Sequence, residues 1–405
     1  GDNTSGYTSC AAVDTDGFLY TWGYNGYGQL LTGNTTSNYY ASRLPKTMFG
    51  GRSVVYVTSS STRYTSYYAI TDDGRCWSWG QNDYGQLGRG NVTDETTTPV
   101  EMTAQSGSGL LNKKVLHIMS SEGNSNVVRT WFLTTEGKVY FCGQNETYGA
   151  YSGLISASSS VNITLPAELT DAATTINSDG QKVVAMYTGG GRYSTNYYIT
   201  DGGNSGETAS KVYANGLNTN GEMGTGSNTA HGSASGNWRL KEIEFDSGPE
   251  IMTIAHNSTQ VTGTKSTFAS GGSNQNRMKI GRIVKVMQHG HGSNTTFPVM
   301  ALDEFGQAYA CGEWSTKSPI SYYNNDDPID FQSNNAYSTR FVKMTGQPEP
   351  FIDLIFMNRT TEGEVGYAGI SASGKIYQGG YAGWGLLGNR STYSTDHFVT
   401  PIGLD

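Results

Sequence analysis

The chain has 405 residues, of which only 15% are charged, and it contains 54 glycines and 27 tyrosines. Its formal net charge of −8, without any cluster of Lys and Arg, excludes the basic surface that a nucleic-acid-binding protein needs. No apolar run approaches the roughly 18–20 residues that cross a bilayer, so we expect no membrane insertion. A composition poor in helix formers favours short strands joined by tight turns.

An aromatic strand that ends in glycine recurs along the chain. It first appears at residues 19–23 (Leu-Tyr-Thr-Trp-Gly), and its fullest copy ends at Trp79-Gly80 after the turn pair Asp73-Gly74. The glycines that close the copies lie near positions 23, 80, 143, 216, 271, 312 and 380, and the copy near Gly271 is degenerate. Such a repeat indicates that each copy is one supersecondary unit.

Each copy reads as four short strands. In one copy the strands are expected at residues 98–102, 114–119, 129–134 and 138–142. Equivalents of the second of these are expected at residues 54–57, 183–186, 250–255, 283–287 and 351–356. Four antiparallel strands repeated seven times predict an all-β fold, a seven-bladed β-propeller that forms a single domain over residues 1–405.

The first copy lacks its leading strands. Residues 8–13 already resemble the third strand of a blade, whereas residues 398–402 form a spare strand at the other end of the chain. We expect this C-terminal strand to pair with the first blade, because closing the ring removes an exposed sheet edge.

The residues around Trp79 resemble a known family. Residues 79–90 read Trp-Gly-Gln-Asn-Asp-Tyr-Gly-Gln-Leu-Gly-Arg-Gly, with echoes at residues 22–30 and 384–389. This pattern is similar to the repeat of RCC1 (regulator of chromosome condensation) proteins, and the resemblance spans nearly the whole chain. It implies a seven-bladed propeller. Members of that family differ in function, from nucleotide exchange on a small GTPase at chromatin to secreted enzyme inhibition and scaffolding, so fold does not fix function.

No set of residues predicts catalysis, a metal or a cofactor. Residues 263–266 (Gly-Thr-Lys-Ser) lack the upstream glycine of a phosphate-binding loop. His289 and His291 have no third ligand nearby, and residues 324–327 lack the spacing of a calcium loop. The Asp-Gly pairs recur as tight turns do, whereas one catalytic carboxylate would not need a copy in each blade. We therefore expect a protein that is not an enzyme.

The four cysteines are too few for a disulfide scaffold and are expected to be buried thiols. Cys142 and Cys311 occupy the phase that Trp79 holds in its copy, and because those copies are not neighbours no bond between them is expected. Cys10 and Cys76 fall in adjacent copies, where a bond is conceivable.

The short turns and the long connections fall on opposite faces of the predicted propeller. The long segments are residues 59–67, 122–126, 148–162, 189–196, 222–237 and 313–339. Their Tyr, Ser, Thr, Asn and Gly residues give recognition loops rigid contact area and adaptable hydrogen bonding. The candidate contacts are Tyr64, Tyr67, Tyr148, Tyr151, Tyr193, Trp238, Trp314, Tyr322 and Tyr323.

These patterns favour a non-enzymatic recognition or structural protein that binds a macromolecule through the long-loop face. The composition favours a phage or virion receptor-binding or tail-fibre component within a larger assembly, located on a virion or outside the cell. Its partner would be a protein or a surface polysaccharide. Two alternatives stay open: a cytoplasmic RCC1-like regulator of a small GTPase or assembly scaffold, and a secreted enzyme inhibitor.

Overall fold

The computed structural model describes residues 8–60, 65–93, 98–120, 128–145, 161–169, 180–189, 195–203, 210–216, 218, 221–226, 240–243, 245–246, 254–256, 259–261, 282–289, 298–314, 323–324, 327–328, 336–344, 346–359, 365–380 and 395–401. These residues form strands and two short 3-10 helices, η1 (Lys46–Phe49) and η2 (Met102–Ala104). The predicted all-β class is confirmed. Over these same ranges, no helix is long and apolar enough to cross a bilayer.

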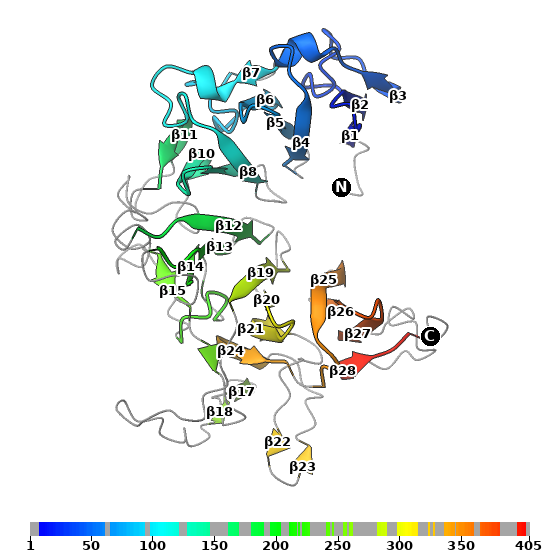
Figure 1. Ribbon diagram of the computed structural model, residues 1–405, viewed down its shortest axis with the longest axis vertical. Helices are drawn as coiled ribbons and strands as arrows, with labels where there is room; N and C mark the ends of the chain where they lie inside the picture. The colour runs from blue at the N-terminus through cyan, green and yellow to red at the C-terminus, as the bar shows by residue number, and fades with distance from the viewer. Residues whose placement is uncertain are drawn as a thin grey trace.

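The described strands form six sheets of three to five strands and two small hairpins. The six sheets follow one another along an open arc, with the first sheet at one end and the sixth at the other (Figure 1). We name the strands of each sheet by their order from the concave side of the arc: inner, second, glycine and outer strand.

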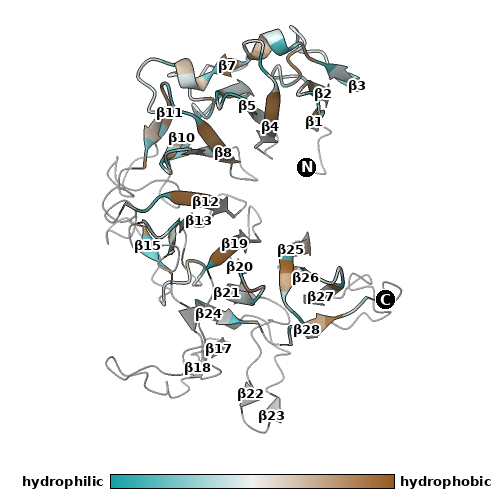
Figure 2. Cartoon of the chain, viewed as in Figure 1, coloured by the Kyte–Doolittle hydropathy of each residue, from teal (hydrophilic) through white to brown (hydrophobic). Residues whose placement is uncertain are grey.

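Five sheets begin with an inner strand. These strands are β4 (Val54–Ser59), β8 (Val115–Ser120), β12 (Val183–Thr188), β19 (Ile283–Gln288) and β25 (Phe351–Arg359). They agree with the strands predicted at residues 54–57, 114–119, 183–186, 283–287 and 351–356. Figure 2 shows that they carry much of the hydrophobic colour on the concave side.

All six sheets have a second strand. The second strands are β1 (Ser9–Val13), β5 (Ser66–Thr71), β9 (Arg129–Thr134), β13 (Thr195–Thr200), β20 (Val299–Asp303) and β26 (Val365–Ser371). Among the described strands, the first sheet therefore begins with a second strand rather than an inner strand, as the sequence predicted from residues 8–13. In the described residues no inner strand precedes β1.

A tight turn leads from the second strand to the glycine strand in five sheets, whereas the connection in the fourth sheet comprises residues 201–211. The glycine strands are β2 (Leu19–Gly23), β6 (Cys76–Gly80), β10 (Val139–Asn145), β14 (Val212–Gly216), β21 (Ala308–Trp314) and β27 (Ile376–Gly380). Gly80 shows why glycine closes the strand. Its φ is +97°, and a Cβ atom there would press against the carbonyl oxygen of Thr65.

The outer strands differ most in length. They are β3 (Asn38–Arg43), β7 (Val100–Glu101), β11 (Val161–Glu168), β15 (Lys241–Glu242), β24 (Ala336–Lys343) and β28 (Thr395–Val399). The fifth sheet has one more strand, β16 (Phe245–Asp246), parallel to β24. The two hairpins are β17 (Ile254–His256) with β18 (Thr259–Val261), and β22 (Tyr323–Asn324) with β23 (Asp327–Pro328).

Two predictions about strand pairing are wrong. The strand predicted at residues 98–102 to lead its own blade is β7, and it pairs with β6 of the preceding sheet, so sheet and sequence repeat are offset by one strand. The C-terminal strand does not pair with the first sheet, because β28 completes the sixth sheet by pairing with β27. The copy near Gly271 lies outside the described residues, so the predicted count of seven blades stays a prediction.

The hydrophobic core is divided among the junctions between neighbouring sheets. One cluster joins the first and second sheets around Leu19, Phe49 and Trp79, and another joins the second and third around Tyr68 and Phe132. Further clusters join the third to the fourth, the fourth to the fifth and the fifth to the sixth sheet. Each sheet is thus stabilised mainly by the faces of its neighbours.

Candidate binding surface

Only Tyr67, among the predicted aromatic contacts, has a side chain that the structure describes. It is 3% exposed, its ring stacks on Trp79 with the centroids 5.5 Å apart, and its hydroxyl donates a hydrogen bond to Ser9 Oγ at 3.0 Å. The prediction that Tyr67 contacts a ligand from a loop is wrong, because Tyr67 belongs to β5 and packs against the first sheet.

The other predicted contacts fall where no side chain is described. Trp314 ends β21 and Tyr323 begins β22, so their backbones are placed within strands. The remaining six lie outside the described residues, and they are Tyr64, Tyr148, Tyr151, Tyr193, Trp238 and Tyr322.

An asparagine holds the Gly-Gln-Leu-Gly loop together. Asn82 Oδ1 accepts a hydrogen bond from the Leu87 N–H at 3.0 Å, and Asn82 Nδ2 donates to the Asn91 carbonyl at 3.0 Å. The side-chain oxygens of Asn25 in the first sheet and Asn218 in the fourth sheet accept the equivalent hydrogen bond from a loop N–H, at 2.8 and 2.9 Å. The motif that is strongest in the sequence therefore orders its own loop.

The same loops connect neighbouring sheets. A side chain on the following glycine strand donates to a loop carbonyl in three places: Trp79 Nε1 to Gln29 (2.9 Å), Cys142 Sγ to Gln86 (3.0 Å) and Cys311 Sγ to Glu222 (3.6 Å). This confirms that the two cysteines share the phase of Trp79. All four cysteines are free, and burial raises the pKa of the Cys142 and Cys311 thiols, which keeps the donating proton in place.

The opposite face consists of tight turns that are closed by the first side chain of each turn. Asp14 Oδ1 accepts from the Phe18 N–H at 2.8 Å, and Asp303 Oδ1 accepts from the Gln307 N–H at 2.8 Å. The hydrogen bond from Phe18 lowers the pKa of the Asp14 carboxyl below its usual value. Asp14 and Asp303 are therefore turn caps. The predicted tight turns at the Asp-Gly pairs are confirmed, because the Gly17 N–H donates to the Asp14 carbonyl and the Gly74 N–H to the Thr71 carbonyl.

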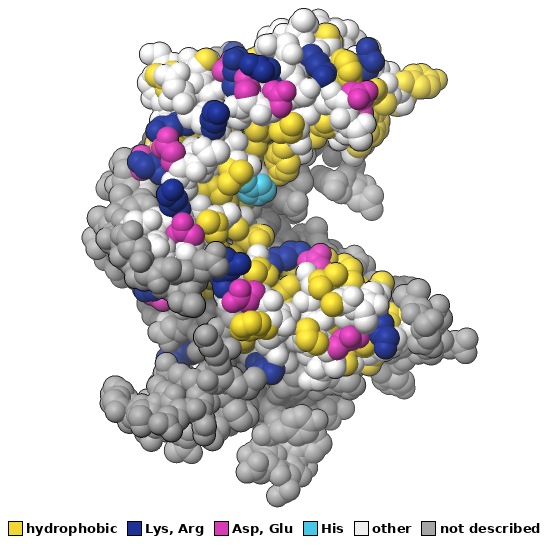
Figure 3. Space-filling view, in the orientation of Figure 1, with side chains coloured by type: hydrophobic (Ala, Val, Ile, Leu, Met, Phe, Trp, Pro, Cys, Tyr) yellow, Lys and Arg dark blue, Asp and Glu magenta, His cyan; other side chains and the backbone are white. Residues whose placement is uncertain are grey.

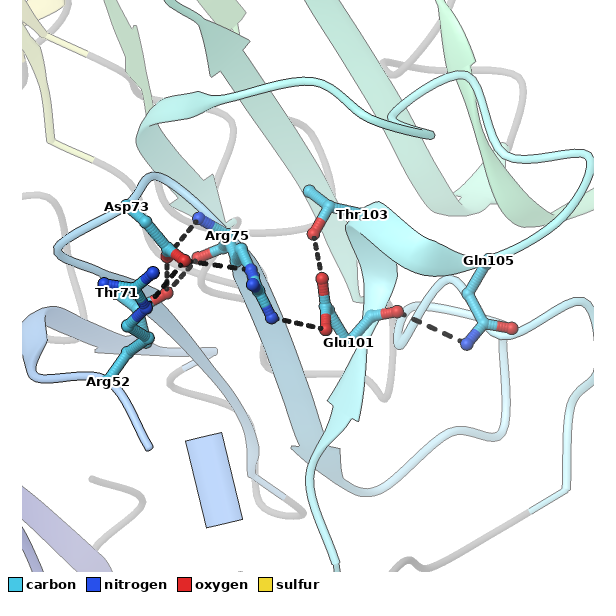
Figure 4. Close-up of polar contacts among 7 residues, drawn as sticks. All are labelled: Arg52, Thr71, Asp73, Arg75, Glu101, Thr103 and Gln105. Atoms are coloured by element: carbon cyan, nitrogen blue, oxygen red, sulfur yellow. Dashed lines mark hydrogen bonds and ion pairs between the residues drawn. The ribbon is translucent and has the colours of Figure 1, made fainter. Parts of the chain in front are cut away.

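Charged side chains on the turn face pair with one another. Asp73 Oδ2 lies 3.2 Å from Arg52 Nε and 2.9 Å from Arg75 Nε, and Arg75 also reaches Glu101 Oε2 at 3.4 Å (Figure 4). Burial alone would raise the pKa of the Asp73 carboxyl, but hydrogen bonds from Thr71 and Arg75 and the two arginine charges lower it overall. Similar pairs join Lys113 to Glu136, Lys138 to Glu168 and Lys211 to Glu242. Most of the described charges on this face are therefore paired.

The concave side of the arc exposes aliphatic side chains at one repeated position. Each inner strand has a β-bulge at its second residue, so that this residue is left without a partner on the second strand. These residues are between 40% and 64% exposed, and we call them the concave row: Val55, Leu116, Val184, Val284 and Ile352. Figure 3 shows hydrophobic side chains gathered along the hollowed inner side of the arc.

Lysines flank the middle of the concave row. Lys114 and Lys182 directly precede β8 and β12, and each lies beside a tight-turn glycine of the preceding sheet, Lys114 beside Gly74 and Lys182 beside Gly137. Both are exposed, and neither forms an ion pair within the part of the chain that the structure describes. The sequence contains the signal for this surface, a pair of apolar residues that opens every inner strand, but such a pair does not by itself distinguish an exposed residue from a core residue.

Within the described ranges, no three His, Cys, Asp or Glu residues group to hold a metal ion. His289 packs edge-on against Phe356 with centroids 5.4 Å apart, whereas His291 and residues 263–266 lie outside the description. Asn324 and Asp327 form the short β22–β23 hairpin.

Comparison with known proteins identifies one repeat. The model of the regulator of chromosome condensation (RCC1) repeat matches residues 16–62 and 73–125. Relatives include the E3 ubiquitin-protein ligase HERC2 of Homo sapiens, 38% identical over 23% of this chain and 2% of that protein. They also include the ultraviolet-B receptor UVR8 of Arabidopsis thaliana, 29% identical over 55% of this chain and 42% of the receptor. The chain thus matches less than half the length of either relative.

Solved structures resemble the chain over almost its whole length. Human WBSCR16 superposes with a TM-score of 0.55 at 17% identity, covering 98% of this chain and 79% of that one. Prp20p from Saccharomyces cerevisiae, described together with its binding to Gsp1p and histones, superposes with a TM-score of 0.57 at 14% identity, covering 98% and 75%. At these identities the likeness shows the fold alone.

Proposed function

We propose, because the chain is an RCC1-like repeat protein, that it is a non-enzymatic protein-binding module whose concave row receives a segment of a partner protein. One observation carries this proposal: five equivalent aliphatic side chains are exposed at the same bulged position of the inner strands of successive sheets. Contiguous apolar surface of this kind marks interaction sites in soluble proteins. On the turn face, by contrast, most described charges are paired with one another.

The chemistry of the row specifies the partner. Leu116 and Val184 accept aliphatic or aromatic side chains, and the exposed Lys114 and Lys182, which form no ion pair with a described residue, complement carboxylates at the turn-face end of these strands. The segment that fits is therefore apolar with acidic residues at its edge. Lysines held near an apolar patch also favour such a segment over a basic one, through electrostatic complementarity.

The known proteins favour the regulator or scaffold class over a virion component. The similar proteins named above are a ubiquitin ligase, a light receptor and a protein described with its binding to Gsp1p and histones. These names support a protein partner, and none of them supports a tail fibre or a surface polysaccharide. We therefore prefer the intracellular RCC1-like regulator or assembly scaffold as the function of this chain.

A photo-crosslinking experiment tests the concave row. Benzoylphenylalanine is introduced at Leu116, and at Val92 as the matched control, because Val92 is similarly exposed but lies in a loop away from the row. We expect a protein to be captured from position 116 and not from position 92. That protein is then purified and titrated against the wild type, the double variant L116D/V184D and the control V92D.

We expect the double variant to weaken binding at least tenfold and V92D to leave it unchanged, because the row sites are exposed and bulged and tolerate aspartate. Equal capture at both positions, or binding that the double variant does not alter, would contradict the proposal. Saturable binding of a surface polysaccharide would contradict the choice of a protein partner, and turnover of any bound ligand would contradict the non-enzymatic class.

The long-loop face remains a second proposed contact surface. Trp314, Tyr322 and Tyr323 fall in one of its longest segments, and the composition of that segment is typical of recognition loops. Replacing all three with alanine is expected to weaken binding of the same partner. Unchanged affinity would remove this face from the proposal and leave the concave row.

We also propose that residues 1–405 act as one domain. The support is that a hydrophobic cluster joins every pair of consecutive sheets from the first to the sixth. A single urea transition seen at once by tryptophan fluorescence and far-UV circular dichroism is expected. Two separated transitions would show independent units.

A further inference from the structure

The tight turns meet the inner strands at the junctions between neighbouring sheets. At four junctions the first residue of the inner strand donates its backbone N–H to the turn glycine of the preceding sheet, at 2.9–3.1 Å. These pairs are Val54 with Gly17, Val115 with Gly74, Val183 with Gly137 and Phe351 with Gly306. The member of the concave row is the next residue of the inner strand. Two further positions flank each hydrogen bond: the residue before the turn glycine and the residue before the inner strand.

The residue before the turn glycine is acidic at three of these junctions and aromatic at the fourth. In chain order the four residues are Asp16, Asp73, Glu136 and Phe305. The turns around Asp16 and Phe305 are built alike, because both residues donate their N–H to the capping aspartate at 3.0 Å. Phe305 is 60% exposed. The turn therefore does not require an aromatic side chain, and Phe305 is available for contact.

The residue before the inner strand changes at the same junction. Each of these residues lies against the turn glycine, and in chain order they are Ser53, Lys114, Lys182 and Pro350. Pro350 is exposed, and the row member that follows it, Ile352, is 64% exposed, more than any other member of the concave row. Among the four junctions, the one between the fifth and sixth sheets thus carries apolar residues at all three positions. We call Phe305, Pro350 and Ile352 the apolar end of the row.

The junctions with lysine have the opposite character. The acidic residues there are already paired, Asp73 with Arg75 at 2.9 Å and Glu136 with Lys113 at 2.8 Å. The positive charges of Lys114 and Lys182 are therefore not neutralised by the turn residues beside them. These two lysines form the basic end of the row.

The charges near the apolar end do not attract an acidic group. Lys285 Nζ lies 2.6 Å from Asp353 Oδ1, so this lysine is paired. Glu349 directly precedes Pro350, and a hydrogen bond from Tyr377 lowers the pKa of its carboxyl. Glu349 therefore keeps its negative charge and disfavours a carboxylate beside Pro350.

We propose that the concave row binds its partner segment in one orientation, with aromatic or aliphatic side chains against the apolar end and carboxylates toward the basic end. This inference rests on the proposed function of the row and adds the residues that determine its specificity. Exposed aromatic side chains at the centre of an apolar contact commonly dominate binding energy, whereas flanking charges select the partner. Phe305 is thus the expected anchor contact.

The separation of the two ends sets the length of the segment. Packed sheets lie about 10 Å apart, so the third and sixth sheets are separated by about 30 Å along the arc. An extended chain covers about 3.3 Å per residue, and about ten residues therefore reach from one end to the other. A short linear segment of a partner protein satisfies this requirement.

A synthetic peptide of this design serves as the probe, with the sequence Glu-Glu-Glu-Ser-Gly-Val-Ser-Val-Phe-Leu and a fluorescent label. Its binding to the full chain is measured by fluorescence anisotropy. One control peptide has the same composition with acidic and apolar residues alternating, and a second has serine in place of its Phe and Leu. The protein variants are F305S, F305L, K114E/K182E and the control V92S. Serine suits the turn, because Ser373 holds the equivalent position in the sixth sheet.

We expect saturable binding of the probe and about tenfold weaker binding of the alternating peptide. F305S is expected to weaken binding of the probe about tenfold, whereas F305L and V92S leave it nearly unchanged. The peptide without Phe and Leu should bind wild type and F305S equally, which couples Phe305 to the apolar part of the probe. K114E/K182E should weaken both of these peptides.

Absence of probe binding, equal binding of the segregated and alternating peptides, or an unchanged affinity in F305S would overturn the inference. If F305S does not fold, loss of the coupling is tested with I352S in its place. A concentration-dependent dimer of the free protein that F305S dissociates would also overturn it, because the occupant would then be a second copy. The proposed function fails separately, when L116D/V184D leaves binding of the captured partner unaltered.

Discussion

The first and second sheets carry the same repeat, but their second strands lie in different surroundings. β5 is covered by β4 and is buried along its whole length, whereas no described strand pairs with the inner edge of β1 and no residue of β1 is fully buried. Beyond this strand the sheets agree: both have the turn cap, the closing glycine and the asparagine-held loop.

The difference shows which parts of the repeat depend on neighbours. Loop and turn geometry are set within the repeat, because their hydrogen bonds close over a few residues. Burial of the second strand depends on an inner strand that belongs to the preceding segment of the chain. Substitutions at equivalent positions of the two sheets therefore separate local from neighbour-dependent stability.

The largest difference is expected for the tryptophan that precedes the closing glycine. Trp79 is fully buried and donates to the Gln29 carbonyl of the first sheet, whereas its equivalent, Trp22, is half-buried. We expect Trp79→Ala to lower the free energy of unfolding by about 3–5 kcal/mol and Trp22→Ala by about 1 kcal/mol. Urea denaturation measures the free energy of unfolding of both variants. Equal losses would show that Trp22 is packed as tightly as Trp79.

The closing glycines should show a smaller contrast. Both Gly80 and Gly23 have positive φ, and a Cβ atom would meet the carbonyl oxygen of Thr65 or Thr8. Thr65 is buried, whereas Thr8 is exposed. We expect Gly80→Ala to cost about 3 kcal/mol and Gly23→Ala about half of that in chemical denaturation. The reverse order would mean that Thr8 is held more firmly than Thr65.

The loop asparagines should show no contrast. Asn82→Ala and Asn25→Ala each leave the same loop N–H and carbonyl groups unpaired, and each is expected to cost about 2 kcal/mol. Thermal unfolding compares the two variants. A much smaller loss of unfolding free energy for Asn25→Ala than for Asn82→Ala would show that the loop of the first sheet also depends on neighbouring strands. The distinction between local and neighbour-dependent parts of the repeat would then be wrong.

The smallest effect concerns the turn face and depends on pH. The folded-state pKa of Asp73 is lowered, so its carboxylate stabilises the folded protein above the unfolded pKa of about 3.9, and this contribution is lost as pH falls through the folded pKa. We expect Asp73→Asn to cost about 0.5–1 kcal/mol at neutral pH. Denaturation midpoints at pH 7 and pH 3 should converge for wild type and variant at the lower pH, and a constant gap would contradict the lowered pKa.

The sequence was sufficient to predict the repeated unit. Turn pairs such as Asp73-Gly74 and closing glycines such as Gly80 have a conformational requirement that appears in the sequence itself. The inner strands were found from apolar runs, and the shared phase of Trp79, Cys142 and Cys311 was predicted and confirmed by their common bonds to loop carbonyls.

The pairing of strands between copies was not predictable in the same way. β7 pairs with β6 and β28 pairs with β27, so each completes the sheet of the strand that precedes it in the sequence. The periodicity of the sequence does not indicate whether such a strand pairs with the preceding or with the following sheet. Tyr67 was taken for a loop residue because the strand boundary between residues 59 and 67 is not marked by glycine or proline. The concave row was missed because its residues look like core, and only the bulge in each inner strand exposes them.

Amide hydrogen exchange of Ala11 in β1 and its equivalent Tyr68 in β5 tests the openness of the first sheet most directly. Both amides point to the inner edge, where Tyr68 faces Thr58 of β4 and Ala11 faces no described strand. We expect Tyr68 to be strongly protected and Ala11 to exchange at a rate near that of an unstructured peptide. Equal protection of the two amides would show that an inner strand already covers β1.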